Sequence, residues 1–164
     1  MSEGWILNAS PIITLAKVGH LNLLVDLAPE ICIPQAVFRE IIAGPDDDPG
    51  RRALEDGWGK KLAKSYSHPE VLGWSLGAGE SEVLSIALEK SGWIAVIDDA
   101  TARACARSFG VPVIGTLGVV LRAKRQGLVT SASKIIRKLS YAGLYLDDQF
   151  VRAVLKQVAG EDWQ

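Results

Sequence analysis

The sequence predicts an α/β protein, in which a parallel sheet carries helices on both faces. Two observations carry this prediction: short apolar runs alternate with helical patterns four times, and no internal repeat or coiled-coil heptad occurs. Of the 164 residues, 48 % are hydrophobic and 23 % are charged, which is typical of a globular protein. We expect residues 1–164 to form a single domain of about four to five strands, with residues 128–164 as a helical C-terminal extension.

Four predicted strands are apolar or β-branched runs that end at a polar, proline or glycine residue. In order along the chain, they are residues 5–8 (WILN), 30–34 (EICIP), 93–99 (WIAVIDD) and 111–115 (VPVIG). The periodicity of residues 51–76 is weak, so we expect only a helical turn and an edge strand over 60–66 in that segment.

The predicted helices share an apolar face at helical spacing, with a capping residue at the beginning or a glycine at the end. In order, they cover residues 12–18, 21–28, 34–44, 77–92, 99–110, 116–127, 131–142 and 148–159. Ser10 is the expected cap of the first helix, and Pro11 suits its first turn. Residues 44–50 (GPDDDPG) are predicted to form a solvent-facing loop.

The composition argues against several kinds of site. Cys32 and Cys105 lie in apolar patterns and are predicted to be buried free thiols, because structural zinc needs four closely spaced ligands. No apolar run approaches the length of about 20 residues that spans a membrane, and no export signal begins the chain. We therefore expect a cytoplasmic protein. The chain has neither a phosphate-binding GK[ST] loop nor a complete dinucleotide fingerprint.

Positive charge is concentrated in one part of the chain, although the net charge is −1. Between residues 111 and 146 there is no Asp or Glu, whereas six basic residues occur. They are Arg122, Lys124, Arg125, Lys134, Arg137 and Lys138. Such a stretch is typical either of phosphate contacts with nucleic acid or of an ordinary solvated helix face, and the sequence leaves both interpretations open.

Polar side chains are expected to gather where the parallel strands end, because all these ends lie at one edge of the sheet. The strand ends contribute Asn8, Asp98, Asp99 and Thr116, and neighbouring helices contribute Glu40, Glu80 and Glu82. Converging carboxylates repel one another unless a cation neutralises them. Mg²⁺ and Mn²⁺ take oxygen ligands, and such a site supports metal-assisted phosphodiester hydrolysis. Taken singly, each acid also suits a helix cap or an exposed position.

Five stretches of the sequence, in order, resemble the PIN-domain family. They are LNASPIITLAKVGHLNLL, IPQAVFREI, GAGESEVLSIALE, VIDDATARACARSFGVPVIGTLGVVLRAKRQGL and VLKQVAGE. More narrowly, they resemble the subfamily of short, VapC-like proteins called domain of unknown function 3368. The resemblance implies a three-layer α/β/α sandwich and an acidic ribonuclease site that uses Mg²⁺ or Mn²⁺. It also implies single-stranded RNA as substrate, a small antitoxin protein as partner, and a homodimer.

The resemblance also implies where the site residues lie. Its acids fall on residue 8, Glu40, Glu80 (with Glu82 as the alternative) and Asp98 or Asp99, and Thr116 is an additional polar residue expected near the nucleic acid. The family usually has aspartate at residue 8, where this chain has asparagine. An amide oxygen still binds a hard cation, but it carries no charge and cannot act as a base.

Several interpretations of Asn8 remain open. The protein is a nuclease with weakened metal affinity, an inactive relative retained for binding nucleic acid or protein, or a toxin whose aspartate was exchanged to permit its expression. A nucleotide- or metabolite-binding α/β protein that uses the same crevice is a further alternative.

Overall fold

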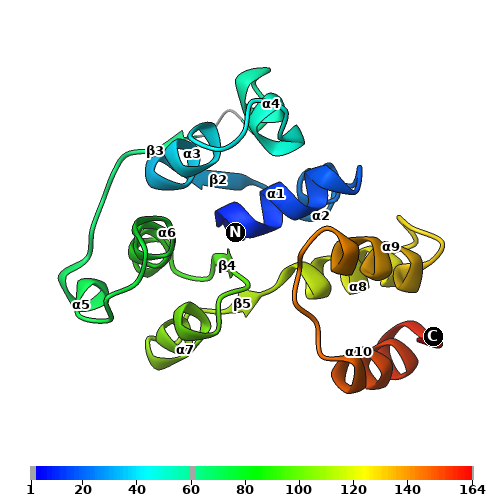
Figure 1. Ribbon diagram of the computed structural model, residues 1–164. Helices are drawn as coiled ribbons and strands as arrows, with labels where there is room; N and C mark the ends of the chain where they lie inside the picture. The colour runs from blue at the N-terminus through cyan, green and yellow to red at the C-terminus, as the bar shows by residue number, and fades with distance from the viewer. Residues whose placement is uncertain (1–2, 60–61, 164) are drawn as a thin grey trace.

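The computed structural model describes residues 3–59 and 62–163, and its centre is a five-stranded parallel sheet (Figure 1). The strand order is β3-β2-β1-β4-β5. The strands are β1 (Trp5–Leu7), β2 (Ile31–Pro34), β3 (Leu62–Ala63), β4 (Ile94–Val96) and β5 (Val113–Ile114). The sheet confirms the predicted fold class. The predicted edge strand over 60–66 is present as β3, although residues 60 and 61 lie outside the described residues.

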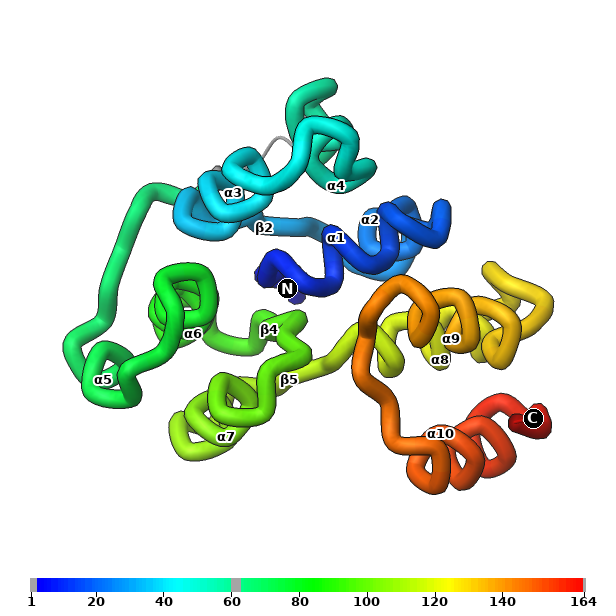
Figure 2. The backbone as a smooth tube through the Cα atoms, viewed as in Figure 1, coloured from blue at the N-terminus to red at the C-terminus, as the bar shows by residue number. Residues whose placement is uncertain are grey.

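Helices cover both faces of the sheet, as Figures 1 and 2 show. They are α1 (Ala9–Lys17), α2 (Leu23–Leu27), α3 (Gln35–Ile42), α4 (Pro49–Glu55), α5 (Pro69–Leu72), α6 (Ala78–Glu89), α7 (Ala100–Ser108), α8 (Thr116–Arg125), α9 (Ala132–Tyr141), α10 (Asp148–Val154) and the π-helical turn η1 (Leu155–Ala159). Helix α6 packs on β1, β2 and β4 with α7 beside it, whereas α1, α2 and α8 pack together on the other face. The result is a three-layer α/β/α sandwich.

The connections explain why helices lie on two faces. From β1 to β3 the chain steps outward in one direction, and from β3 through β4 to β5 it steps in the other. Because parallel crossovers are right-handed, this reversal moves α6 and α7, which lead into β4 and β5, to the opposite face. Strand β1 lies at the centre and pairs with both β2 and β4. The crevice outside the carboxyl end of β1 is therefore the switch point where α/β proteins bind ligands.

The core is built from strands that are buried on both faces. All three residues of β1, Trp5, Ile6 and Leu7, are buried, as expected for a parallel strand between two helical layers. Cys32 and Cys105 are buried free thiols, as the sequence predicts, and burial raises the pKa of both. Within the described residues, no helix is both long and apolar enough to cross a membrane.

The beginning of α1 differs from the sequence prediction. Asn8, not Ser10, is the N-cap residue, with an extended backbone and no capping bond from its side chain. Ser10 lies inside the first turn, and its hydroxyl donates to the carboxylate of Asp98 at 2.9 Å. The prediction that Ser10 caps α1 is wrong because a partner 88 residues away takes the hydroxyl, and local sequence does not reveal that partner.

The C-terminal segment is anchored to α9 through Glu161. Its carboxylate accepts hydrogen bonds from the backbone N–H groups of Ala132 (2.8 Å) and Ser133 (3.1 Å) and from the hydroxyl of Ser131 (3.1 Å). Burial alone would raise the pKa of Glu161, but these hydrogen bonds outweigh it and lower the pKa to about 2. The two C-terminal helical segments expected from the sequence are both present, as α9 and as α10 continued by η1.

Candidate functional site

Asn8 lies directly after β1, at the centre of the carboxyl edge. Its backbone N–H donates to the carbonyl oxygen of Val96 at 3.1 Å, which fixes the end of β1 beside the end of β4. The residue is only 4 % exposed, and its Oδ1 has no hydrogen-bond partner among the described residues. A buried polar atom without a partner costs about 1–3 kcal/mol. This oxygen is therefore available to bind a cation or to accept a hydrogen bond.

Glu40 of α3 approaches Asn8 across Gly79 of α6. A Cβ atom added to Gly79 would lie 3.2 Å from Asn8 Oδ1 and 3.3 Å from Glu40 Oε1. Both oxygens therefore face the same point, and the missing side chain of Gly79 leaves room between them. Three elements that are far apart in the sequence, the end of β1, α3 and α6, supply this arrangement.

Glu80, in the first turn of α6, adds a second carboxylate to the group formed by Asn8 and Glu40 around Gly79. Burial raises the pKa of Glu40, and the negative charge of Glu80 raises it further. The Glu80 side chain folds back toward the beginning of α6, because its Oε2 would lie 2.7 Å from a Cβ added to Gly77. The charge of Glu80 therefore acts on Glu40, and their repulsion is the electrostatic cost of the arrangement.

Asp98 follows β4 and is held by donors from two other elements. Thr116 donates its backbone N–H to Oδ1 at 2.8 Å and its hydroxyl to Oδ2 at 2.7 Å. Ser10 donates its hydroxyl to Oδ2 at 2.9 Å. Since Ser10 lies only two residues after Asn8, this network places Asp98 at the same edge as Asn8 and Glu40.

Two of the predicted acids instead serve helix beginnings. Asp99 is the N-cap of α7, where its side chain accepts from the backbone N–H of Ala102 at 2.9 Å. Glu82 is only 6 % exposed and accepts from the backbone N–H of Ala36 at 3.2 Å, at the beginning of α3, and from the Ser65 hydroxyl at 3.0 Å. These hydrogen bonds satisfy both carboxylates within the fold.

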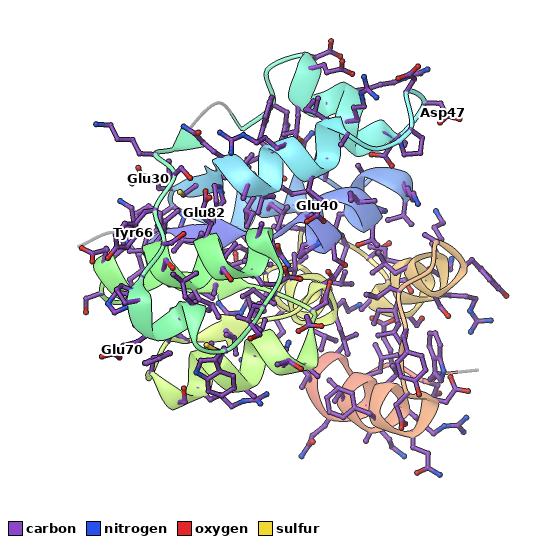
Figure 3. The ribbon with its side chains drawn as sticks, turned by 60° about the vertical axis from the view of Figure 1, so that its left-hand side comes forward. Glu30, Glu40, Asp47, Tyr66, Glu70 and Glu82 are labelled. Atoms are coloured by element: carbon purple, nitrogen blue, oxygen red, sulfur yellow. The ribbon has the colours of Figure 1, made fainter. Side chains whose placement is uncertain are left out.

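The position of Glu82 separates it from the group around Gly79. Figure 3 shows Glu82 apart from Glu40, toward the side of the molecule where Tyr66 lies. Glu80 and Glu82 are two residues apart on α6, and residues at that spacing point about 200° apart around a helix. The structure therefore brings Asn8, Glu40 and Glu80 together and directs Glu82 elsewhere.

The donor chemistry of the group fits a hard divalent cation. Asn8, Glu40 and Glu80 offer only oxygen atoms, which Mg²⁺ and Mn²⁺ prefer as ligands. Among residues 3–59 and 62–163, no group of three or more His, Cys, Asp or Glu side chains is arranged to hold a metal ion. A cation at this edge would therefore draw on the amide oxygen of Asn8 as well as on carboxylates, and that oxygen is unpaired.

The first three basic residues of the expected nucleic-acid stretch lie away from this group. Arg122 lies over the ring of Trp5, 5.8 Å from its centre, and Trp5 begins β1 at the opposite end of the strand from Asn8. Lys124 donates to the carbonyl oxygen of Thr130 at 2.6 Å and so supports the loop after α8. Arg125 is exposed in the last turn of α8.

The other three basic residues share one face of α9. Lys134, Arg137 and Lys138 line a groove of about 590 Å³. The guanidinium group of Arg137 also lies over the ring of Trp163, 5.1 Å from its centre. Helix α9 packs against α8 and η1, so this groove lies on the C-terminal part of the chain.

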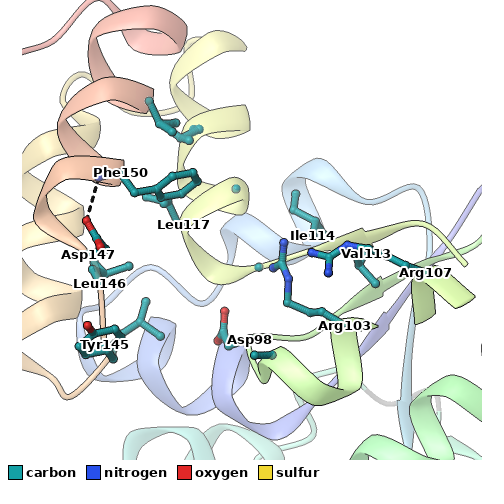
Figure 4. Close-up of a pocket in the computed structure, with 16 residues that line it drawn as sticks. Asp98, Arg103, Arg107, Val113, Ile114, Leu117, Tyr145, Leu146, Asp147 and Phe150 are labelled. Atoms are coloured by element: carbon teal, nitrogen blue, oxygen red, sulfur yellow. Dashed lines mark hydrogen bonds between the residues drawn. The ribbon is translucent and has the colours of Figure 1, made fainter. Parts of the chain in front are cut away.

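Two arginines near Asp98 are missing from the sequence-based site. Arg103 and Arg107 of α7 line a groove with Asp98 (Figure 4). Arg103 also donates to the carbonyl oxygen of Ile97 at 3.3 Å, beside Asp98. A signal was present in the sequence, because a helix that begins after Asp99 carries residues 103 and 107 on one face, one turn apart.

A known protein family matches most of the chain. The family model of domain of unknown function 3368, described as a PIN domain, matches residues 4–160. This range covers all the strands and helices of the structure and every residue of the site described above. A search among curated proteins found no match.

Proposed function

The chain belongs to the PIN-domain family, a nuclease-type fold whose members bind nucleic acids, and from this premise we propose that it is a metal-dependent ribonuclease of the toxin–antitoxin type. Its substrate is single-stranded RNA in the cytoplasm, and its cofactor is Mg²⁺ or Mn²⁺. The observation that carries the proposal is the buried, unpaired Oδ1 of Asn8 beside Glu40. A cation would pair this oxygen and also offset the repulsion between Glu40 and Glu80.

Asn8, Glu40 and Glu80 are the residues that hold the ion, with Asp98 at the adjoining side of the crevice. When bound, the ion supplies positive charge that offsets the negative charge developing on the phosphate oxygens. We assign the acidic positions to Glu80 rather than Glu82, and to Asp98 rather than Asp99. Glu82 and Asp99 already accept hydrogen bonds from backbone N–H groups at the beginnings of α3 and α7.

The remaining residues of the site position the carboxylate of Asp98. Thr116 and Ser10 hold it in one orientation through three hydrogen bonds. Oδ1 accepts one of these bonds and Oδ2 accepts two, so Oδ1 keeps capacity for a further donor or ligand. Arg103, beside Asp98, supplies a guanidinium group that suits a phosphate.

Asn8 weakens this site in comparison with an aspartate. An amide oxygen contributes a dipole to the cation but no net charge, so the ion is bound by two carboxylates where an aspartate would provide a third. We therefore expect weak metal affinity and slow cleavage in the natural sequence. Asn8→Asp should bind the metal more tightly and cleave RNA faster.

The test is RNA cleavage by the purified protein with Mn²⁺ and with EDTA. The proposal expects slow, Mn²⁺-dependent cleavage of mixed single-stranded RNAs, faster cleavage by Asn8→Asp, and none by Asp98→Ala. Asn22→Asp is the matched control, because it makes the same exchange at an exposed residue outside the site. If neither the natural protein nor Asn8→Asp cleaves RNA with Mn²⁺, the proposal is wrong.

One observation favours a second candidate function, a nucleic-acid- or protein-binding module without catalysis. This observation is Asn8 itself, which removes a charge from the position nearest the switch point of the sheet. The same experiment separates the two functions. If only Asn8→Asp cleaves RNA and the natural protein still binds it, the site is one that binds RNA without cleaving it.

A further inference from the structure

We propose that the groove between α7, the beginning of α8 and α10 is a nucleotide subsite, which holds the RNA residue beside the phosphodiester bond at Asp98. The groove has a volume of about 480 Å³, within the range of about 300–1,000 Å³ typical of ligand sites. Asp98 lines it together with residues from these three helices (Figure 4). The identification of the ligand as RNA rests on the proposed function.

The cationic side of the groove suits a phosphate group. Arg103 and Arg107 are one turn apart on α7, and both line the groove. Figure 4 shows both guanidinium groups beside Ile114, with Arg103 extending from α7 next to Asp98. A guanidinium group binds phosphate through two parallel N–H donors, so this pair suits the backbone of the nucleotide next to Asp98.

The opposite side of the groove offers aromatic rings at its surface. Tyr145, in the segment before α10, is 87 % exposed, and Phe150 of α10 is 59 % exposed. Large aromatic side chains gain free energy when they are covered, and nucleic-acid bases stack on such rings in single-stranded RNA sites. A base on these rings and a phosphate at the arginines together use both sides of the groove.

The groove on the other side of the site has the wrong charge for RNA. It has a volume of about 460 Å³ and is lined by Glu40, Asp47 and Asp48, with Lys17 as its cation. Its three carboxylates outnumber its one cation and repel a phosphate backbone, whereas in the groove at Asp98 two arginines balance the carboxylates of Asp98 and Asp147 and two aromatic rings are added. Charge complementarity therefore directs the RNA strand from the site toward α7 and α10.

The test measures binding of a fluorescently labelled RNA trinucleotide in EDTA, which separates binding from cleavage. Tyr145→Ala should weaken binding about tenfold, because it removes a stacking surface. Arg107→Gln should weaken binding and reduce its dependence on salt concentration, because it removes a phosphate contact. Tyr66→Ala and Arg152→Gln are matched controls, since both side chains are exposed and neither lines the groove.

The outcomes separate the subsite from the ribonuclease proposal. If the natural protein cleaves RNA with Mn²⁺ while Tyr145→Ala and Arg107→Gln bind the trinucleotide normally, the subsite is wrong and the proposed function stands. If no variant cleaves RNA but both groove variants bind more weakly than their controls, the subsite stands and the ribonuclease is wrong. Equal weakening by Tyr145→Ala and Tyr66→Ala overturns the subsite, because the contact is then not specific to the groove.

Discussion

The side-chain oxygens of Asn8 and Glu40 lie on either side of the space that a side chain at Gly79 would fill. A Cβ atom added to Gly79 would lie 3.2 Å from Asn8 Oδ1 and 3.3 Å from Glu40 Oε1. The two residues are 32 positions apart in the chain, and they meet because β1 and β2 are neighbouring parallel strands. Among the described residues, Asn8 Oδ1 has no hydrogen-bond partner.

Gly79→Ala should weaken Mn²⁺ binding by about tenfold or more, because its methyl group occupies the space between the two oxygens. The free energy of unfolding should change by less than about 1 kcal/mol, since the helix propensity of alanine offsets the crowding. Calorimetric titration with Mn²⁺ and urea denaturation measure the two effects. Gly73→Ala is the control, because its Cβ meets only a backbone oxygen at 3.6 Å. Unchanged Mn²⁺ affinity in Gly79→Ala would contradict the arrangement.

Glu40→Gln should raise the melting temperature of the metal-free protein at neutral pH. Burial and the charge of Glu80 raise the pKa of Glu40 in the folded state, so ionisation of Glu40 costs stability. This cost is absent below the unfolded-state pKa and develops as the pH rises through the raised folded-state pKa. The gain in melting temperature should therefore be present near pH 8 and absent near pH 4.

The control for this measurement is Glu70→Gln, which changes an exposed glutamate on α5. Scanning calorimetry in EDTA across this pH range gives the difference between each variant and the natural protein. A difference for Glu40→Gln that is the same at every pH would show that ionisation of Glu40 is not its cause.

Exchanges at Glu80 and Glu82 should have opposite effects. Glu82→Ala leaves the N–H of Ala36 and the hydroxyl of Ser65 without their acceptor, so it should lower the free energy of unfolding by about 2 kcal/mol. It should leave Mn²⁺ affinity unchanged. Glu80→Ala should weaken Mn²⁺ binding with little loss of stability, because it relieves repulsion with Glu40. Urea denaturation and Mn²⁺ titration of both variants measure the two effects. Loss of Mn²⁺ affinity in Glu82→Ala and loss of stability in Glu80→Ala would contradict the assignment.

Acid should loosen the C-terminal segment through Glu161. Its pKa is lowered to about 2 in the folded state, so its contribution to stability is complete above the unfolded-state pKa and is lost as the pH falls toward 2. Glu161→Gln should cost about 2 kcal/mol at neutral pH and nothing near pH 2. Denaturation at several pH values, with Asp162→Asn as the exposed neighbouring control, measures this difference. An equal cost at every pH would contradict the account.

The fold and the edge that carries the site were predictable from the sequence. Apolar runs alternating with helical patterns determine a parallel sheet, and parallel strands end at one edge. This reasoning correctly brings Thr116 to Asp98, which are 18 residues apart and joined by two hydrogen bonds. It also predicts that Asn8 follows the first strand, whereas the central place of this strand in the sheet comes from the pairing of β1 with β2 and β4.

The choice between neighbouring acids was not predictable, because it depends on how each element is rotated. Glu80 and Glu82 lie on the same helix, and only packing decides which of them faces Glu40 and which faces α3. In the same way, Asp99 caps α7 while Asp98 accepts from Thr116. Both members of each pair are carboxylates close to the beginning of a helix, so residue type alone does not distinguish them.

The position of the basic stretch depends on helix length, which a count of charges along the chain ignores. Helix α8 rises about 1.5 Å per residue, so Arg122 lies about 9 Å along it from Thr116. This displacement carries Arg122 to the amino end of the strands, over Trp5. Arg103 is only three residues after the beginning of α7, or about 4.5 Å along it, and therefore lies near Asp98, and Arg107, one turn further, lines the same groove.

A crystal soaked in Mn²⁺ and measured at a wavelength where manganese scatters anomalously would show directly whether Asn8, Glu40 and Glu80 hold a cation. We expect an anomalous peak about 2.1 Å from Asn8 Oδ1 and from carboxylate oxygens of Glu40 and Glu80. A map without this peak, with Asn8 Oδ1 bonded to a protein donor and Glu40 turned to solvent, would contradict this assignment.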